Sequence, residues 1–292
     1  MADIRMKCII CNNDMQNLFN INSYKLIHCP LCSHRMLDTT DLHLNIGDTY
    51  SDDYFFGGGA GYPDYLEEKD ILVEHGRYYG ELLGKYFDKP GVLLDVGAAS
   101  GFILKGLTES GWQGEGIEPN ARMAQYAQSE LGLKVHASTL ESFHTERRFD
   151  LVCFIQVIAH LPNPAKGVEI SSSMLSKNGY ILIESWNYRS WTARLFGKRW
   201  HEYSPPSVLH WFSKESLNRM MGQFGFELIA SGRPKKWLNW KHARTIILFK
   251  LDKHPLSRAM KMLSSLVPEK ARVPYPGEDL LWFLFKKKHQ LD

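Results

Sequence analysis

The chain has 292 residues, enough for one domain of ordinary to large size with a small addition. Hydrophobic residues make up 44% of it and charged residues 23%, which excludes a disordered tail or a fibre. Its longest apolar runs, such as 280–285, are far shorter than the roughly 20 residues that a membrane span needs. Charged residues among the first seven positions argue against the apolar core of a secretory signal. We therefore expect a cytoplasmic protein.

The charge is unevenly distributed along the chain. The net charge is only +3, but residues 233–273 hold eleven Lys or Arg and two acids. The remainder of the chain is then about six units negative. This imbalance predicts an anionic partner for the C-terminal region, with a solvated helix face as the alternative.

Four of the five cysteines form two closely spaced pairs near the N-terminus. The pairs are Cys8-x2-Cys11 and Cys29-x2-Cys32, with 17 residues between them. Two such turns can direct four thiolates at one tetrahedral Zn²⁺, and with no ligand position left open the ion would have a folding role. Two disulfides are the alternative, although a chain without an export signal rarely keeps them. The alternating stretch 24–27 predicts a hairpin strand between the pairs, so we expect a zinc ribbon over residues 1–45.

From residue 66 onward, predicted helices and strands alternate. Strands are expected at 92–96, 116–118, 135–137, 149–156, 179–185, 226–231 and 279–285, with helices at 66–87, 102–110, 121–131, 165–176 and 214–224. This alternation is typical of a parallel sheet with helices on both faces. Ligands of such sheets bind at the carboxyl ends of the strands.

Glycines and acids follow the first strands of this pattern. The segment Asp95-Val-Gly-Ala-Ala-Ser-Gly101 predicts a strand–turn–helix loop whose glycines let a ligand approach the backbone. The helix N-terminus after it favours a carboxylate or phosphate. Glu118 ends the next strand, 17 residues after Gly101, where an acid can accept both hydroxyls of a ribose; a surface acid is the alternative. The apolar strand at 149–156 runs into a His-Leu-Pro turn that begins at His160.

Together these segments resemble the successive motifs of the class I S-adenosylmethionine-dependent methyltransferases, over roughly residues 75–232. The pattern is most similar to small-molecule and sugar methyltransferases that carry an N-terminal four-cysteine zinc ribbon. The resemblance implies an α/β fold with a Rossmann-like, mostly parallel seven-stranded sheet. We divide the chain into the ribbon (1–45), a lid or linker with a first helix (46–90), the cofactor-binding core (91–232) with an acceptor-pocket insertion (186–213), and a basic C-terminal segment with a closing strand (233–292).

The chain departs from the family pattern at three positions. The middle glycine of the first loop is Ala99, which narrows the cofactor site. The acid that often precedes the His-Leu-Pro element is Ala159, and a histidine usual before the Phe-Ser element is Val208. The substrate role of that histidine is therefore not carried over.

The resemblance implies a site for S-adenosylmethionine at the strand ends. Its methionine moiety would lie against Asp95, Gly97, Ala98 and Gly101, its ribose on Glu118, its adenine against Pro119, Ser138, Thr139 and Leu140, and its sulfonium over Gln156 and Val157. The glycine-rich stretch 57–61, between Tyr54 and Tyr65, is predicted to close over the cofactor as a lid, with a plain linker as the alternative.

The acceptor would bind in the insertion after the fifth core strand. Its candidate lining residues are Glu184, Trp186, Asn187, Trp200 and Tyr203, although these aromatics could equally belong to the core. Three histidines, His160, His201 and His210, are candidate bases for an acceptor that must lose a proton. For each of them a packing role is the alternative.

Three functions fit these features. The leading one is methyl transfer to an oxygen or carbon atom of a small or carrier-linked metabolite such as a sugar, a glycan or a natural-product intermediate. The alternative is an RNA methyltransferase, because Trp237 and Trp240 among lysines resemble a stacking and phosphate-binding surface. The near-neutral ribbon argues against RNA, as does Gln156-Val-Ile-Ala in place of the Asn/Asp-Pro-Pro-Tyr sequence of many base-amino methyltransferases. An inactive scaffold is third, disfavoured by Glu118 and the glycine loop.

Overall fold

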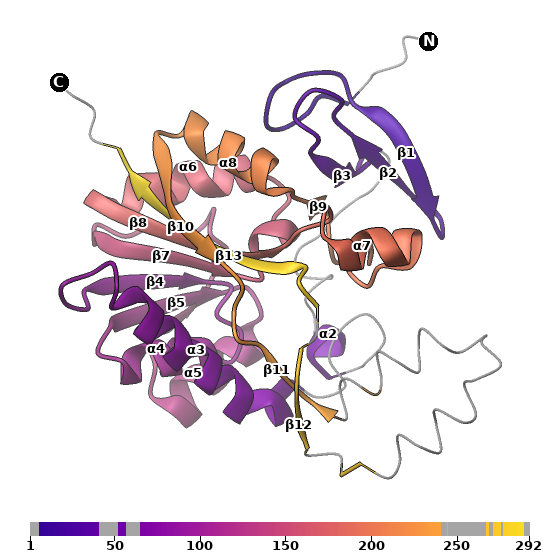
Figure 1. Cartoon of the computed structure of the whole chain (residues 1–292). Helices are drawn as coiled ribbons and strands as arrows, with labels where there is room; N and C mark the ends of the chain where they lie inside the picture. Colours follow the sequence, from indigo (N-terminus) through magenta and orange to yellow (C-terminus); the bar gives the residue numbers. More distant parts are fainter. Residues whose placement is uncertain are drawn as a thin grey trace.

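The computed structural model describes residues 6–40, 52–56, 65–240, 244, 267–268, 271–275 and 277–288. A central sheet has helices on both faces, and a smaller sheet lies beside one end of it (Figure 1). In this part of the chain, no helix has the length and apolar character needed to cross a membrane. The predicted lid at 57–61 and most of the basic segment 233–273 lie outside the described residues.

The central sheet has seven strands in the order β10-β13-β8-β7-β4-β5-β6. They are β4 (Val92–Val96), β5 (Gln113–Glu118), β6 (Val135–Ala137), β7 (Phe149–Ile155), β8 (Leu175–Trp186), β10 (Phe226–Gly232) and β13 (Leu280–Lys287). Every neighbouring pair is parallel except those of β13, which is antiparallel to both β8 and β10. The Rossmann-like, mostly parallel seven-stranded sheet is confirmed.

The central strand β7 is buried on both faces and therefore lacks polar alternation. Its one partly exposed residue, Asp150, lies at the start of the strand. Asp150 Oδ2 accepts the Val92 N–H at 2.9 Å, and Oδ1 accepts the Ser176 hydroxyl at 3.1 Å. This carboxylate therefore holds the starts of β7, β4 and β8 together.

Five helices cover the sheet. They are α3 (Lys69–Leu83), α4 (Phe102–Glu109) and α5 (Ala121–Leu131) on one face, and α6 (Pro164–Met174) and α8 (Lys214–Gln223) on the other (Figure 1). A short 3₁₀ turn, η1 (Tyr65–Glu68), precedes α3. The helix predicted at 66–87 is thus shorter than expected, because Phe87 packs on Trp112 and Tyr180 from a turn beyond the last helical residue.

The ribbon forms a four-stranded antiparallel sheet in the order β1-β2-β3-β9. Its strands are β1 (Gln16–Ile21), β2 (Tyr24–His28), β3 (Arg35–Leu37) and β9 (His210–Trp211). The hairpin predicted around 24–27 is present, but the last strand, β9, comes from the predicted insertion at 186–213. The ribbon is therefore joined to the segment 186–213 of the core through backbone hydrogen bonds.

Smaller elements complete the described structure. They are α2 (Asp52–Phe56), the 3₁₀ turn η2 (Ile158–His160) after β7, α7 (Trp191–Phe196) with η3 (Gly197–Arg199) in the insertion, and the two-stranded pair β11 (Trp237–Asn239) and β12 (Arg272–Pro274). In Figure 1, α7 lies beside the ribbon strands, and β11 and β12 lie beside one end of α3. These elements gather around the carboxyl ends of β7 and β8.

Candidate active site

The loop between β4 and α4 turns sharply because two glycines adopt left-handed backbone conformations. Gly97 has φ 70° and Gly101 has φ 77°. A Cβ atom at Gly97 would lie 2.7 Å from Cγ2 of Val157, so glycine lets this loop pack against the end of β7. Ala99 also has a positive φ of 47°. Its methyl group is accommodated in a buried apolar cluster with Tyr65.

Two buried carboxylates end strands β4 and β5. Glu118 Oε2 accepts the Ala99 N–H at 2.9 Å and Oε1 accepts the Asn120 N–H at 2.8 Å. Burial raises the pKa of Glu118 to about 7, although these two hydrogen bonds act to lower it. Burial, and then the charge of Glu118, raise the pKa of Asp95 to about 7. The pair suits a ligand that brings hydroxyl donors and a positive charge.

Tyrosines from α2 and η1 lie near these carboxylates. Burial, followed by the charges of Glu202 and Glu118, raises the pKa of Tyr54. Burial, followed by Glu118 and Asp95, raises the pKa of Tyr65. Both tyrosines therefore experience the negative charge of Glu118.

The other predicted cofactor residues lie at the same edge of the sheet. After β6, Ser138 and Thr139 both bond to Ser142 in a turn, and Leu140 is buried. Pro119 precedes Asn120, whose side chain caps α5 by accepting the Met123 N–H at 3.0 Å. The Ala98 N–H donates to the Ile117 carbonyl at 3.0 Å, which ties the loop to β5.

A buried carboxylate organises the ends of β7 and β8. Glu184 Oε2 accepts from His75 Nε2 at 2.8 Å and from the Tyr79 hydroxyl, and Oε1 accepts from Gln156 Nε2 at 2.8 Å. Gln156 Oε1 in turn accepts from Lys236 Nζ at 3.0 Å. Burial acts to raise the pKa of Glu184, but His75, Lys236 and Tyr79 together outweigh it and lower the pKa. This network fixes the side chain of Gln156 where β7 ends.

Aromatic rings surround His201 in the insertion. The ring of Trp186 lies 4.6 Å from that of His201 and 5.4 Å from that of Tyr275, both edge to face. Lys236 Nζ lies over the Trp186 ring, 4.9 Å from its centroid. An ammonium group and an imidazole therefore both contact one indole ring.

Two acids lie beside the same imidazole. His201 Nδ1 is 3.9 Å from Asp279 Oδ2, and Nε2 is 3.5 Å from Glu202 Oε1. Asp279 is buried and accepts from Trp200 Nε1 at 2.7 Å and from the Tyr275 hydroxyl at 2.8 Å. Trp200 thus orients Asp279, and Asp279 lies where it stabilises a protonated His201.

The other two candidate histidines have different surroundings. His160 Nδ1 donates to the Ser207 carbonyl at 2.7 Å, which leaves the imidazole lone pair on Nε2, and burial lowers its pKa. His210 lies in β9 with Nδ1 3.1 Å from Nε2 of His34, and burial lowers its pKa to about 4. His210 belongs to the interface with the ribbon.

Two predicted lining residues are engaged in holding the insertion. The Asn187 N–H donates to the Asp279 carbonyl at 2.6 Å, and its side chain accepts the Arg189 N–H at 3.0 Å. The Tyr203 hydroxyl accepts from Arg35 of β3, so Tyr203 faces the ribbon.

Sequence reasoning missed His75, Tyr79, Lys236, Tyr275 and Asp279 as site residues. His75 and Tyr79 are four residues apart on the buried face of α3. An imidazole and a hydroxyl group on an otherwise apolar helix face need buried polar partners, and the sequence pattern alone could have indicated this. Lys236 and Tyr275 lie in or near a segment whose composition indicates a basic surface. Their approach to Trp186 depends on the β11–β12 pairing, which leaves no local signal.

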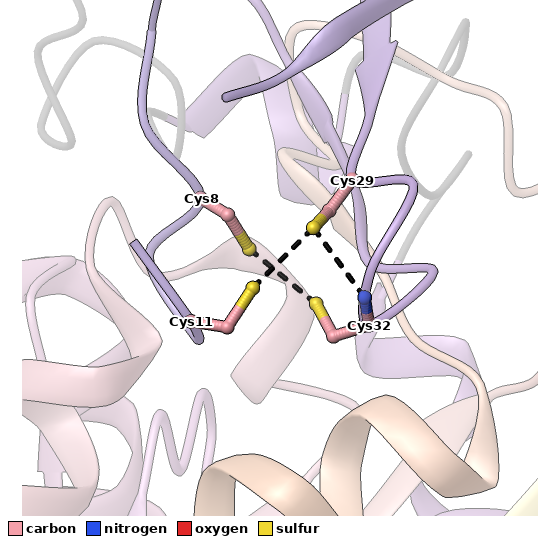
Figure 2. Close-up of side chains that lie close together, drawn as sticks. All are labelled: Cys8, Cys11, Cys29 and Cys32. Carbon is pink, nitrogen blue, oxygen red and sulfur yellow. Dashed lines mark hydrogen bonds between the residues drawn. The ribbon is translucent and has the colours of Figure 1, made fainter. Parts of the chain in front are cut away.

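The four ribbon cysteines converge on one point (Figure 2). Their sulfur atoms lie within 4.8 Å of one another, with Cys8 Sγ 3.5 Å from Cys32 Sγ and Cys11 Sγ 3.4 Å from Cys29 Sγ. A tetrahedral Zn²⁺ with bonds of about 2.3 Å would space its sulfurs by about 3.8 Å. None of the five cysteines forms a disulfide, so the donor set fits a metal and the disulfide alternative is not what the structure contains.

The sequence matches the family described as "Methyltransferase domain" over residues 75–231. It is 25% identical to a ubiquinone biosynthesis O-methyltransferase of Bradyrhizobium diazoefficiens over 127 residues, which are 42% of this chain and 48% of that protein. The counterpart in Azoarcus is 27% identical over 157 residues, 47% of this chain and 65% of that one. For the first of these relatives, the chain spans about half the length of the protein it matches.

Solved structures show the same fold at lower identity. One is a methyltransferase of Thermotoga maritima described as a possible histamine N-methyltransferase, with a TM-score of 0.51, 21% identity, and coverage of 77% of this chain and 92% of that one. Another is magnesium protoporphyrin IX methyltransferase of Synechocystis with bound S-adenosylhomocysteine, with a TM-score of 0.50, 12% identity, and coverage of 82% and 94%. At these identities the likeness concerns the fold alone.

Proposed function

This chain belongs to the class I S-adenosylmethionine-dependent methyltransferase family, and on that premise we propose that it methylates an oxygen or carbon atom of a small or carrier-linked metabolite. When bound, S-adenosylmethionine supplies a methyl group activated by positive sulfur. Glu118 is suited to hold its ribose because its carboxylate is already oriented by two backbone N–H groups. Asp95, at the end of β4, adds a second negative charge for a cationic ligand.

The observation that carries this proposal is a small cavity beside Gln156. It has a volume of about 270 Å³ and is lined by His75, Lys236 and Trp237 among others from α3 and the start of β11. Gln156 belongs both to this cavity and to the predicted floor of the cofactor site. A space of this size suits a compact acceptor, and Lys236 offers it a positive charge.

We assign proton removal to His201, with His160 as the second candidate. In methyl transfer the acceptor atom must be aligned, and a hydroxyl or carbon acid must lose its proton. His201 lies against Trp186, and Asp279 and Glu202 are placed to stabilise its protonated form. Lys236, which lies over Trp186 and lines the cavity beside Gln156, would orient an acceptor oxygen. His210 receives no catalytic role, because it is bonded to the ribbon.

The RNA alternative has less support. Lys236, one of the lysines of the stacking surface that the sequence suggested, bonds to Gln156 and lies over Trp186. Trp237 is 40% exposed, and Lys241 lies outside the described residues. A surface for single-stranded RNA needs several exposed cations in line with stacking rings.

The test uses cofactor with a labelled methyl group. The full chain is incubated with an extract of its source cells, which is then separated into RNA, protein, lipid–glycan and small-molecule fractions. The proposal expects label in the small-molecule or glycan fraction, absent with Glu118→Ala. Ribonuclease-sensitive label would overturn it in favour of RNA.

We also propose that the ribbon holds one structural Zn²⁺ through Cys8, Cys11, Cys29 and Cys32. Four thiolates leave no open ligand position, so the ion would stabilise the fold and take no part in chemistry. The knuckle geometry supports this assignment, because the Ile10 and Cys32 N–H groups each approach a cysteine sulfur at 3.4 Å.

A further inference from the structure

A second hollow lies between the ribbon and α7, apart from the cavity beside Gln156. It has a volume of about 430 Å³ and is lined by Phe19, His28, Ser33, Arg35, Tyr188, Arg189, Ala193, Arg194, Gly197, Lys198 and Tyr203. We call it the ribbon groove. It takes residues from β1, β2 and β3 on one side and from the insertion on the other, so it exists only because the ribbon docks on the core.

The ribbon groove concentrates positive charge, and among the described residues acids balance little of it. Four of its lining residues are Arg or Lys, and none of the described residues that line it is Asp or Glu. Arg189 alone of the four forms an ion pair within the described part of the chain, with Glu215 at 3.3 Å. Cations gathered without counter-charges repel one another, and an anion relieves that repulsion.

Neutral groups hold Arg35 in place. Its guanidinium donates to the Tyr203 hydroxyl and lies over the Tyr188 ring, 3.9 Å from the centroid. A guanidinium has five N–H donors in a fixed fork, and these two contacts leave donors available for a ligand. An arginine that is fixed by aromatic groups and has no carboxylate partner is preorganised for an oxyanion.

Flanking cations complete the site. Lys198 Nζ lies 5.2 Å from the Phe19 ring centroid, and the Arg189 guanidinium donates to the Ser33 hydroxyl at 2.8 Å. Arg194 is exposed on α7 between them in sequence. Several cations around one hollow bind a phosphate group, with a charge near −2, more strongly than they bind a carboxylate with a charge of −1. Each cation is attracted by both negative charges of the phosphate.

We propose that the ribbon groove binds a phosphate or diphosphate group carried by the acceptor. The link to the acceptor rests on the proposed function. It follows from the position of Tyr203, which lines the groove and packs against Trp200 at 5.2 Å, while Trp200 in turn lies 5.8 Å from His201. A series of edge-to-face ring contacts, from Tyr203 through Trp200 to His201, thus connects the groove with the candidate base.

The phosphate group can belong to a free metabolite or to a lipid headgroup, and α7 makes the second source testable. Trp191 is 77% exposed and Leu195 is 82% exposed on this helix. Apolar side chains beside cations are typical of a segment at an anionic membrane surface. The ligand chemistry is the same in both cases, so the experiment carries one arm for each source.

The first arm titrates inorganic pyrophosphate into the full chain by calorimetry. The test variant is Arg194→Gln/Lys198→Gln, whose side chains are exposed and whose loss leaves the core intact. The matched control is Lys89→Gln/Lys177→Gln, which removes the same charge from exposed sites near the starts of β4 and β8, at the opposite edge of the sheet. We expect saturable binding that weakens roughly tenfold or more in the test variant and stays unchanged in the control.

The second arm measures sedimentation with phosphatidylglycerol vesicles. Vesicle binding that the test variant loses, without binding of pyrophosphate, would assign the phosphate to a lipid. Equal losses in both double variants would reduce the effect to net charge and overturn the proposal, as would the absence of any binding in both arms. The labelled-methyl experiment is read separately, so pyrophosphate binding without methyl transfer would leave the groove standing and remove the proposed function.

Discussion

At the scale of single residues, Glu118 makes the most direct prediction. Glu118→Ala removes the carboxylate that two backbone N–H groups orient, so affinity for S-adenosylhomocysteine should fall by about 100-fold through the loss of charge-assisted hydrogen bonds. Calorimetry measures this. Glu109→Ala, an exposed acid on α4, is the matched control, and zinc content should stay constant. An unchanged affinity in Glu118→Ala would refute the ribose assignment.

The same carboxylates predict a pH dependence. The pKa values of Asp95 and Glu118 are raised to about 7 in the folded protein, so the charged forms that suit the cofactor are lost as the pH falls through neutrality. Affinity for S-adenosylhomocysteine should rise several-fold from about pH 6 to about pH 8.

The stability of the unliganded protein should follow the opposite course. A carboxyl group with a raised folded pKa binds its proton more tightly in the folded state, so its contribution to the free energy of unfolding falls as the pH rises from its ordinary pKa of 4.5 to about 7 and is level above that. Calorimetry from about pH 6 to about pH 8 and thermal unfolding from about pH 4 to about pH 8 check both signs. A flat affinity profile would show that neither carboxylate titrates in the site.

The candidate base gives a third prediction. His201→Asn should lower kcat by about 100-fold or more, because general base catalysis typically contributes this much, while affinity for S-adenosylhomocysteine stays the same. The lower limb of the pH–rate profile should also change. His144→Asn, at an exposed histidine, is the control. If His160→Asn shows this pattern instead, the roles of the two histidines are exchanged.

What the sequence could predict at this scale depended on how local the signal was. Glu118 and the four cysteines stand in short motifs whose spacing carries their chemistry, and the structure gathers the four sulfurs within 4.8 Å of one another. Lys236 meets Gln156 across 80 positions, and no spacing rule predicts such a pair. The cofactor and catalytic assignments remain predictions.

At the scale of elements, α8 connects the sheet and the ribbon. Ser213 and Ser216 form a reciprocal capping box at its start, and Gln223 at its end donates to the Ile10 carbonyl of the ribbon. Ser213→Ala should lower the free energy of unfolding by about 1 kcal/mol and the melting temperature by about 2–4 °C. Ser173→Ala, at an exposed serine of α6, should change it much less. Equal effects in both variants would contradict a capping role.

Elements that depend on local pattern were predicted well, and their ends less so. The apolar run of β7 and the periodicity of α3 each identified the right type of element. The sequence predicted a helix up to residue 87, because apolar residues continue to that point. The helix ends at Leu83, and Phe87 packs against Trp112 from the segment that follows. Strand β9 could not be predicted, because two residues have no periodicity and their partner β3 lies about 175 positions away.

At the scale of the whole molecule, the ribbon that carries the four-cysteine cluster shares one sheet with the insertion at 186–213. Because β9 pairs with β3, and His210 bonds to His34, loss of the ribbon should loosen the insertion that holds His201. The predicted cofactor residues lie at the ends of β4, β5, β6 and β7, and none of these strands belongs to the ribbon sheet. Loss of the metal is therefore expected to impair methyl transfer while leaving cofactor binding intact.

Cys8→Ser/Cys29→Ser should release about one zinc ion per chain, measured by elemental analysis in reducing buffer. Affinity for S-adenosylhomocysteine should change less than about threefold, while transfer of labelled methyl groups should fall by at least tenfold, because the insertion loses the sheet that supports β9. Cys153→Ser, at a buried cysteine of β7 outside the cluster, should keep its zinc. If methyl transfer survives loss of the metal, the insertion keeps its structure without support from the ribbon. If affinity for S-adenosylhomocysteine falls as much as methyl transfer does, the ribbon and the cofactor-binding core unfold together.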